Sequence, residues 1–123
     1  MSAIFTGSCL CGAVRFESSA KPSFQANCHC DDCRQSGGSV FASFVFVPVE
    51  AFRLVQGETQ SHRHLADSGN EVTKNFCSKC GSQIFNTNSG KPERVGIRVG
   101  VIDDASWFQP KANVYCRARL PST

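Results

Sequence analysis

Seven of the eight cysteines in this 123-residue chain form groups at spacings that suit a metal ion: Cys9 with Cys11, Cys28 with Cys30 and Cys33, and Cys77 with Cys80. Alternate residues of an extended segment point to the same side, so Cys9 and Cys11 can reach one ion while Leu10 points into packing. A Cys-x-x-Cys turn places two sulfurs round one ion, and Gly81 suits the left-handed backbone of such a turn. These patterns are typical of zinc.

Metal binding explains the cysteines better than disulfides do. An even number of cysteines also suits a secreted disulfide scaffold, but two cysteines separated by one residue are poor partners for each other. Residues 1–6 lack a basic segment followed by an apolar run. We therefore expect no export signal and a cytoplasmic location, where thiols remain reduced and bind metals.

The seven cysteines divide by spacing into a set of four and a set of three. Cys28, Cys30 and Cys33 lie within six residues and must share one ion. The other four form a closed structural site that ties the N-terminal strand to a later hairpin across about seventy residues, so that binding energy becomes folding energy: Cys9, Cys11, Cys77 and Cys80. Spacing also permits Cys9 and Cys11 to join the triplet. The division into four and three predicts two zinc ions per chain.

A zinc site with three protein ligands keeps one position free for an exogenous ligand. A soft ligand such as a thiolate is the natural occupant. The ion lowers the thiol's pKa, so the sulfur binds as an anion and can attack an aldehyde carbon. Cys28, Cys30 and Cys33 are therefore the candidate catalytic residues.

The polar residues next to the triplet have simpler expected roles. An extended backbone turns His29 away from the metal that its two neighbours bind, which favours packing over ligation or proton transfer. Asp31 and Asp32 are expected to cap backbone N–H groups. Arg34 is placed to attract an anionic substrate or to lie exposed in solvent.

Two further features are expected to lie outside the chemistry. His62 and His64 flank Arg63 in a polar stretch that reads as a solvated strand face. Cys116 stands alone in an apolar strand, where a buried small hydrophobe is the default.

Strands must position these groups. Residues 40–47 (VFASFVFV) are predicted to form a central strand buried on both faces, and residues 12–18 alternate like a strand with one wet face. The other predicted strands are residues 73–76 and 83–85, which flank a cysteine turn as a hairpin, and residues 94–101 and 112–117. Residues 48–54 are the one helical candidate, with Pro48 at its first position. The prediction is an all-β fold, a single domain over residues 1–123.

Composition excludes several classes of protein. Hydrophobic residues at 41% and charged residues at 19% are ordinary for a globular protein, and no window reaches the length of a membrane span. Seven thiolates and two Zn²⁺ bring the formal charge of +3 to zero, and no basic run is present. We therefore expect neither a nucleic-acid nor a membrane partner. The sequence leaves the oligomeric state open.

Five segments in order resemble the glutathione-dependent formaldehyde-activating enzyme family, which includes centromere protein V: GSCLCGAVRFE (7–17), CHCDDCRQSGGSVFASFVFVP (28–48), FRLVQG (52–57), FCSKCGSQIF (76–85) and GVIDD (100–104). The resemblance implies a β-tent fold, an all-β zinc architecture. It also implies a structural zinc on Cys9, Cys11, Cys77 and Cys80 and a catalytic zinc on Cys28, Cys30 and Cys33. The family joins formaldehyde to glutathione as S-hydroxymethylglutathione, formally a carbon–sulfur lyase reaction.

These observations favour a zinc-dependent carbon–sulfur lyase acting on a thiol adduct such as S-hydroxymethylglutathione. The main alternative is a non-catalytic zinc-binding module that binds other proteins. A methionine sulfoxide reductase would need a free nucleophilic cysteine beside two Cys-x-x-Cys pairs. Here only Cys116 is unassigned, and the spacing of Cys9 and Cys11 is wrong for such a pair.

Overall fold

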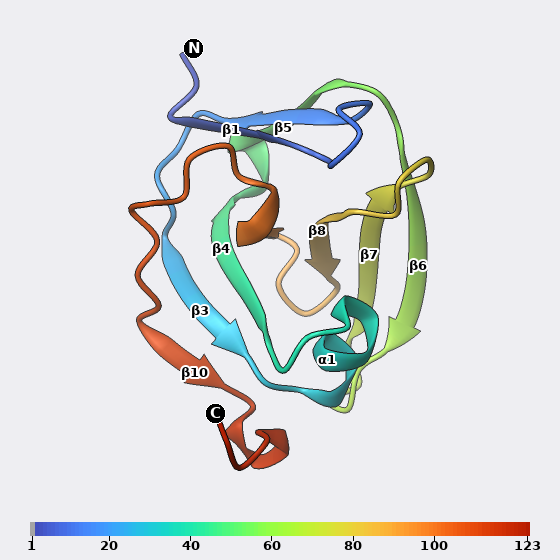
Figure 1. Cartoon of the computed structure of the whole chain (residues 1–123), viewed down its shortest axis with the longest axis vertical. Helices are drawn as coiled ribbons and strands as arrows, with labels where there is room; N and C mark the ends of the chain where they lie inside the picture. Colours follow the sequence, from blue (N-terminus) through green and yellow to red (C-terminus); the bar gives the residue numbers. More distant parts are fainter. Residues whose placement is uncertain (1) are drawn as a thin grey trace.

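The computed structural model describes residues 2–123, whose strands form two sheets (Figure 1). The smaller sheet has the order β1-β2-β5, with both neighbouring pairs antiparallel: β1 (Phe5–Ser8), β2 (Arg15–Ser18) and β5 (Phe52–Gln56). It lies across the top of the molecule in Figure 1. Within the described part of the chain, no helix has the length and apolar character needed to cross a membrane.

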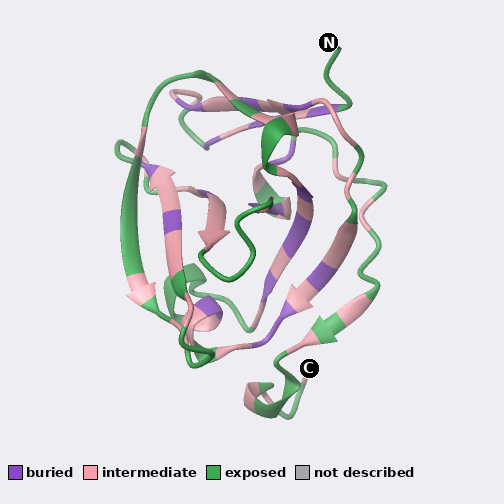
Figure 2. Ribbon diagram, turned by 180° about the vertical axis from the view of Figure 1, so that it is seen from behind, coloured by how far each residue is buried: buried purple, intermediate pink, exposed green. Residues whose placement is uncertain are grey.

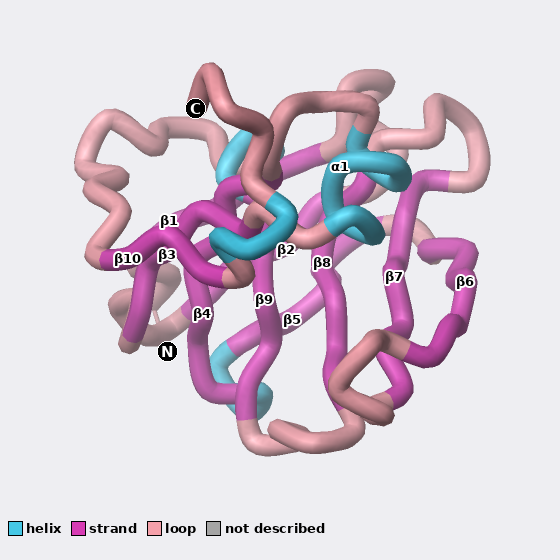
Figure 3. Tube along the Cα trace, turned by 90° about the horizontal axis from the view of Figure 1, so that it is seen from below, coloured by secondary structure: helices cyan, strands magenta, loops and turns pink. Residues whose placement is uncertain are grey.

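The larger sheet has seven strands, which follow one another as a curved wall (Figure 3). In spatial order they are β10 (Ala112–Val114), β3 (Phe24–Cys28), β4 (Ala42–Pro48), β9 (Arg94–Arg98), β8 (Gln83–Asn88), β7 (Glu71–Cys77) and β6 (Thr59–Leu65). All neighbours pair antiparallel except β10 and β3, which are parallel. The all-β prediction is confirmed.

Strand β4 lies inside the larger sheet and has buried residues on both faces, as predicted for residues 40–47, but it starts at Ala42, and Val40 before it is exposed. Val45 and Val47 belong to the main apolar core, which also contains Phe5 and Phe16 of the small sheet. Phe44 belongs to a second cluster on the opposite face, together with buried cysteines. Figure 2 shows the buried segments running along the inner strands while β6 stays exposed. The face of the large sheet that carries Phe44 therefore lies outside the main core and also carries cysteines of the triplet.

The helix predicted at residues 48–54 is wrong. Val49–Ala51 form a single 3-10 turn (η1), and strand β5 starts at Phe52. Leu54 pairs with Phe16 and packs against the core, because a strand there completes the small sheet whereas a helix would leave the edge of β2 open. Tertiary pairing overrides the local signal from Pro48.

The α-helix instead spans Asp31–Gly37 (α1), so it starts within the cysteine triplet and extends beyond it. Its first turn carries Asp31 and Asp32, whose charges suit the positive end of the helix dipole. Gly38 ends it in the left-handed conformation (φ 68°), and its N–H donates to the Arg34 carbonyl at 2.8 Å. The sequence analysis interpreted Cys30 and Cys33 as part of a metal-binding turn and therefore did not predict a helix there.

The last two predicted strands are shorter than expected. Strand β9 ends at Arg98, where the 3-10 turn η2 (Val99–Val101) begins. Strand β10 ends at Val114, and the 3-10 turn η3 (Cys116–Ala118) follows. Tyr115 adopts a left-handed conformation (φ 56°) that turns the chain out of the sheet. Cys116 is consequently exposed, so its predicted burial is wrong.

Gly57 lies between β5 of the small sheet and β6 of the large sheet, in close contact with the backbone of Ala13. Its φ is +78°, and an added Cβ would lie 2.2 Å from the Ala13 carbonyl oxygen. Gly57→Ala should therefore destabilise the protein by about 2 kcal/mol or more, in urea or thermal unfolding. Gly69→Ala is the matched control, because Gly69 has φ +88° with open space around it and should lose only about 1 kcal/mol. Equal losses would contradict the close approach.

Candidate metal centres and the adjoining pocket

The first cysteine cluster brings together Cys9, Cys11, Cys77 and Cys80, whose sulfurs all lie within 4.8 Å of one another. The Sγ atom of Cys11 lies 3.6 Å from that of Cys9 and 3.7 Å from that of Cys77. The first pair follows β1, and the second lies at the turn between β7 and β8. The cluster thus joins the small sheet to a hairpin of the large sheet, as the spacing indicated.

Backbone N–H groups point at these sulfurs. The N–H of Val14 donates to Cys9 Sγ at 3.3 Å, and the N–H of Lys79 donates to Cys77 Sγ at 3.4 Å. The side-chain hydroxyl and the backbone N–H of Ser82 lower the pKa of Cys80 to about 5. Such donors stabilise thiolates, the form that binds a metal.

The local geometry of this cluster agrees with the sequence in one respect and differs in another. Gly81 has the left-handed backbone expected after Cys80, with φ 78°. Cys9 and Cys11, however, are linked by a turn rather than an extended segment. Leu10 is therefore 89% exposed, and its predicted packing is wrong.

The second cluster forms where β3 leads into α1. Cys28 ends β3, Cys30 is the N-cap of α1, and Cys33 lies in the first turn. The Sγ atom of Cys28 is 3.5 Å from that of Cys30 and 3.4 Å from that of Cys33. The N–H of Cys33 donates to Cys30 Sγ at 3.3 Å, so this sulfur replaces the usual oxygen of a helix cap. The cluster lies at the end of the molecule opposite the small sheet (Figure 1).

The three sulfurs perturb one another's protonation. Hydrogen bonds with the side chains of Cys28 and Cys33 lower the pKa of Cys30 to about 2, against an opposing effect of burial, and the charge of Lys74 adds to the lowering. Hydrogen bonds with Cys28 and Cys30 raise the pKa of Cys33, and the bond with Cys30 raises that of Cys28. Three adjacent thiolates repel one another, so all three can ionise together only round a cation.

Both clusters fit a zinc ion. Sulfurs bound to one tetrahedral Zn²⁺ at about 2.3 Å lie about 3.8 Å apart. The sulfur–sulfur separations of 3.4 to 3.7 Å are close to this value, and each cluster offers only thiol ligands. The first cluster supplies four ligands and the second supplies three. The structure therefore provides two sites able to hold a metal, one with four cysteine ligands and one with three, which is one ligand short of a tetrahedral set.

Two buried cations lie near the triplet, and the sequence analysis missed both. Lys74, on β7, is only 5% exposed. Arg98, at the end of β9, is 9% exposed, and the charges of Cys33, Cys28 and Cys30 partly offset the lowering of its pKa by burial. Val72, Lys74 and Phe76 are alternate residues, which line one face of a strand. A lysine between two apolar residues on the same face is the sequence signal that could have identified Lys74 as buried.

Lys74 is held by a chain of polar side chains. Its Nζ lies 2.7 Å from Nε2 of His64 on β6, so the ammonium donates to that ring nitrogen. Nδ1 of His64 lies 3.6 Å from Oδ2 of Asp32 in α1. His64 therefore links the helix to the strand, and the expectation of a solvated face holds for His62 but not for His64.

A pocket of about 540 Å³ adjoins the triplet on the second face of the large sheet. Its aromatic lining comes from Phe24, Phe44 and Phe46 of β3 and β4. Polar and charged side chains also line the pocket, among them Lys74, Asn86, Asn88, Lys91, Arg94, Tyr115 and the three cysteines. A volume of this size accommodates a small molecule.

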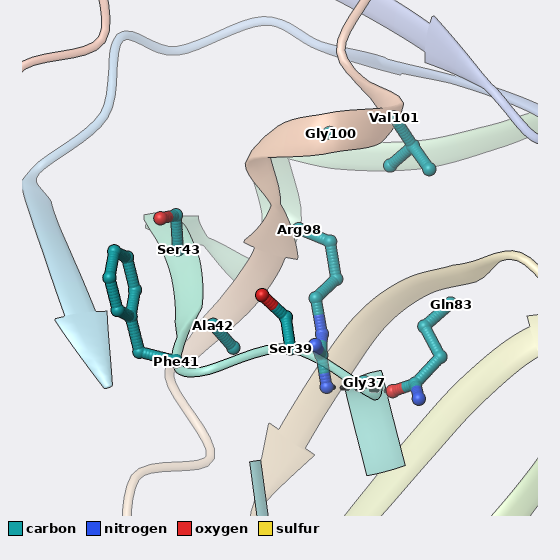
Figure 4. A pocket seen from close by; sticks show the side chains of 9 residues that line it. All are labelled: Gly37, Ser39, Phe41, Ala42, Ser43, Gln83, Arg98, Gly100 and Val101. Atoms are coloured by element: carbon teal, nitrogen blue, oxygen red, sulfur yellow. Dashed lines mark hydrogen bonds between the residues drawn. The ribbon is translucent and has the colours of Figure 1, made fainter. Parts of the chain in front are cut away.

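A second cavity, of about 370 Å³, contains Arg98 but no cysteine (Figure 4). Arg98 Nη2 is 2.7 Å from Gln83 Oε1 and 3.4 Å from Ser36 Oγ. The Arg98 guanidinium also stacks over Phe44, with 4.8 Å between its Cζ and the ring centroid. These partners hold the Arg98 guanidinium in place, and its charge interacts with the three cysteines of the triplet.

The other residues singled out near the triplet have structural contacts. His29 is buried, with Nε2 3.0 Å from Asn113 Oδ1 and its ring against Phe41, which agrees with packing rather than ligation. Asp31 pairs with Arg34 on the surface of α1. The expectation that Asp31 and Asp32 cap backbone N–H groups is wrong, because Cys30 fills the cap and the two carboxylates contact side chains.

Comparison with known proteins agrees with this description. The profile of the family described as glutathione-dependent formaldehyde-activating enzyme matches residues 4–118. A crystal structure of a Rhodobacter sphaeroides protein is similar in fold, with a TM-score of 0.68 and 21% identity. The alignment covers 89% of this chain and 99% of that one.

Proposed function

The chain belongs to the glutathione-dependent formaldehyde-activating enzyme family, and on this premise we propose that it is a zinc-dependent carbon–sulfur lyase. Its substrate would be an adduct of a small thiol and an aldehyde, such as S-hydroxymethylglutathione. The single observation that carries this proposal is the three-cysteine cluster at the end of a pocket large enough for a small molecule.

The proposal gives the two clusters different tasks. Cys9, Cys11, Cys77 and Cys80 would hold a structural zinc and close the fold. Cys28, Cys30 and Cys33 would hold the second zinc. When bound there, the ion would supply a Lewis-acidic position for the substrate sulfur and would lower the pKa of a thiol.

The charges round the triplet favour an anionic sulfur. Three thiolates with Zn²⁺ leave one net negative charge, which the buried cations Lys74 and Arg98 outweigh. Asp31 is paired with Arg34, and Asp32 lies on the partly exposed surface of the helix, where water weakens its effect. A thiolate entering the site therefore meets a favourable potential.

The pocket walls hold the remainder of the substrate. Phe44 and Phe46 present apolar surface beside the cysteines, which excludes water from the reacting groups. Arg94 lies over the Phe46 ring, with 4.1 Å between its Cζ and the ring centroid, and adds a cation to the lining of the pocket. Thiols and formaldehyde combine without a catalyst, so holding a thiolate near an aldehyde is a sufficient catalytic task.

Calorimetric titration of the two-zinc protein with glutathione tests this function. We expect one thiol to bind per chain with release of a proton, because the sulfur binds as its anion. Below the thiol's ordinary pKa of about 8.5, apparent affinity should rise about tenfold per pH unit. A glutathione analogue with a methyl group in place of the thiol is the control and should not bind the site. Absence of thiol binding at every pH would favour a non-catalytic interaction module instead.

A further inference from the structure

The pocket beside the triplet is lined by a hydrogen-bond donor and an acceptor that come from neighbouring strands. Lys74 on β7 and Asn86 on β8 lie directly opposite each other in the sheet register. Directly opposite residues of an antiparallel pair point to the same face, with Cβ atoms about 5 Å apart. Both side chains line the pocket that contains the three cysteines.

The two side chains have complementary hydrogen-bonding capacity. Asn86 Oδ1 is buried and has no hydrogen-bond partner among the described residues. A buried acceptor without a partner costs about 1 to 3 kcal/mol, so a ligand that donates to it recovers that energy. Lys74 donates one of its three ammonium protons to His64, which leaves protons for a ligand.

A hydroxyl group both accepts and donates, so one such group can satisfy both residues. We propose that Lys74 and Asn86 form a subsite for the hydroxyl on the carbon bonded to the substrate sulfur, with Lys74 donating to its oxygen and Asn86 Oδ1 accepting its proton. This inference rests on the proposed function. It gives the site a means to bind 1-hydroxyalkyl thioethers more tightly than simple thioethers, which lack the hydroxyl.

The subsite also suits the reaction in both directions. When the adduct forms, a sulfur electron pair makes the carbon–sulfur bond and the carbonyl electron pair moves to oxygen. The proton that the thiol gives up ends on that oxygen, so no other reactant is needed. The Lys74 ammonium faces the oxygen while it carries negative charge. Cleavage reverses each step, and the hydroxyl proton leaves the oxygen as the carbonyl reforms.

The test compares two ligands of nearly equal size, S-hydroxymethylglutathione in excess formaldehyde and S-methylglutathione, by calorimetry on the two-zinc protein. The wild type should bind the hydroxymethyl compound at least tenfold more tightly. Asn86→Leu should reduce this ratio about tenfold, because it removes the acceptor without changing charge. Asn86→Asp keeps an acceptor oxygen and should retain the preference.

Lys74→Met should also reduce the ratio, whereas Lys21→Met, which changes an exposed lysine outside the pocket, should leave it unchanged. Zinc content and thermal unfolding establish that each variant folds, and if one Asn86 variant fails to fold, Lys74→Met decides the question. Equal affinity of the wild type for both ligands, or an unchanged ratio in the variants, would overturn the subsite. Failure of glutathione itself to bind would instead refute the proposed function.

Discussion

Cys80→Ser should abolish cooperative folding or lower the melting temperature by more than about 20 °C. The four-cysteine cluster joins residues 66 positions apart, from Cys11 to Cys77, and the sheets share one core across this link. A structural zinc site contributes about 10 to 16 kcal/mol of binding energy, comparable with the whole net stability of a typical protein. Thermal unfolding followed by circular dichroism measures the change in melting temperature. The zinc content that remains after dialysis against a chelator measures the loss of the metal.

Cys80 is the informative position because its side chain is only partly buried, whereas Cys77 is part of the apolar core. The loss on replacing Cys80 therefore reports metal binding with little contribution from packing. Cys116→Ser is the matched control, since Cys116 is exposed and belongs to neither cluster, and should change stability by less than about 0.5 kcal/mol. A Cys80→Ser protein with two tightly held zinc ions and an unchanged melting temperature would refute the structural role.

Cys30→Ser should release one zinc ion and reduce thiol affinity at least a hundredfold while the protein stays folded. Serine is among the best N-cap residues, so its oxygen can accept the Cys33 N–H that Cys30 Sγ now accepts. Helix α1 should therefore persist although the metal site is lost. Metal analysis, calorimetry with glutathione and the thermal melting curve together measure the outcome.

Two results would contradict this expectation. If Cys30→Ser prevents folding, the triplet is a structural site, and the division of labour between the two clusters is wrong. If the folded variant with one zinc still binds thiols as tightly as the wild type, the thiol binds elsewhere. The Cys116→Ser protein again serves as the control, because it removes a thiol while leaving both clusters intact.

Much of the fold was predictable because strand signals are local. Residues 40–47 carry a run of β-branched and aromatic side chains long enough for a strand buried on both faces, and β4 occupies that place. The hairpin round Cys77 and Cys80 followed from the segments 73–76 and 83–85, which flank a cysteine turn, and β7 and β8 form that hairpin. The helix at residues 48–54 failed, because the edge of β2 needed a partner that only long-range pairing could supply.

The cysteines were equally visible, but their grouping was not fully determined. Spacing alone requires Cys28, Cys30 and Cys33 to lie together, since they are within six residues. Spacing leaves open where Cys9 and Cys11 go, because any group brought close by folding could complete their site. The structure places them beside Cys77 and Cys80, through the packing of the small sheet on the hairpin.

What the sequence determined by itself was the set of cysteines able to hold a metal and the extended segments that carry them, since both depend on residue type and on neighbours within a few positions. The tertiary structure alone decided what surrounds the triplet. Lys74 meets His64, and Asn86 lies opposite Lys74, through the register of three strands. Register depends on how whole strands pair and pack, which no local pattern specifies, and a shift of one residue would turn Lys74 to the other face of the sheet.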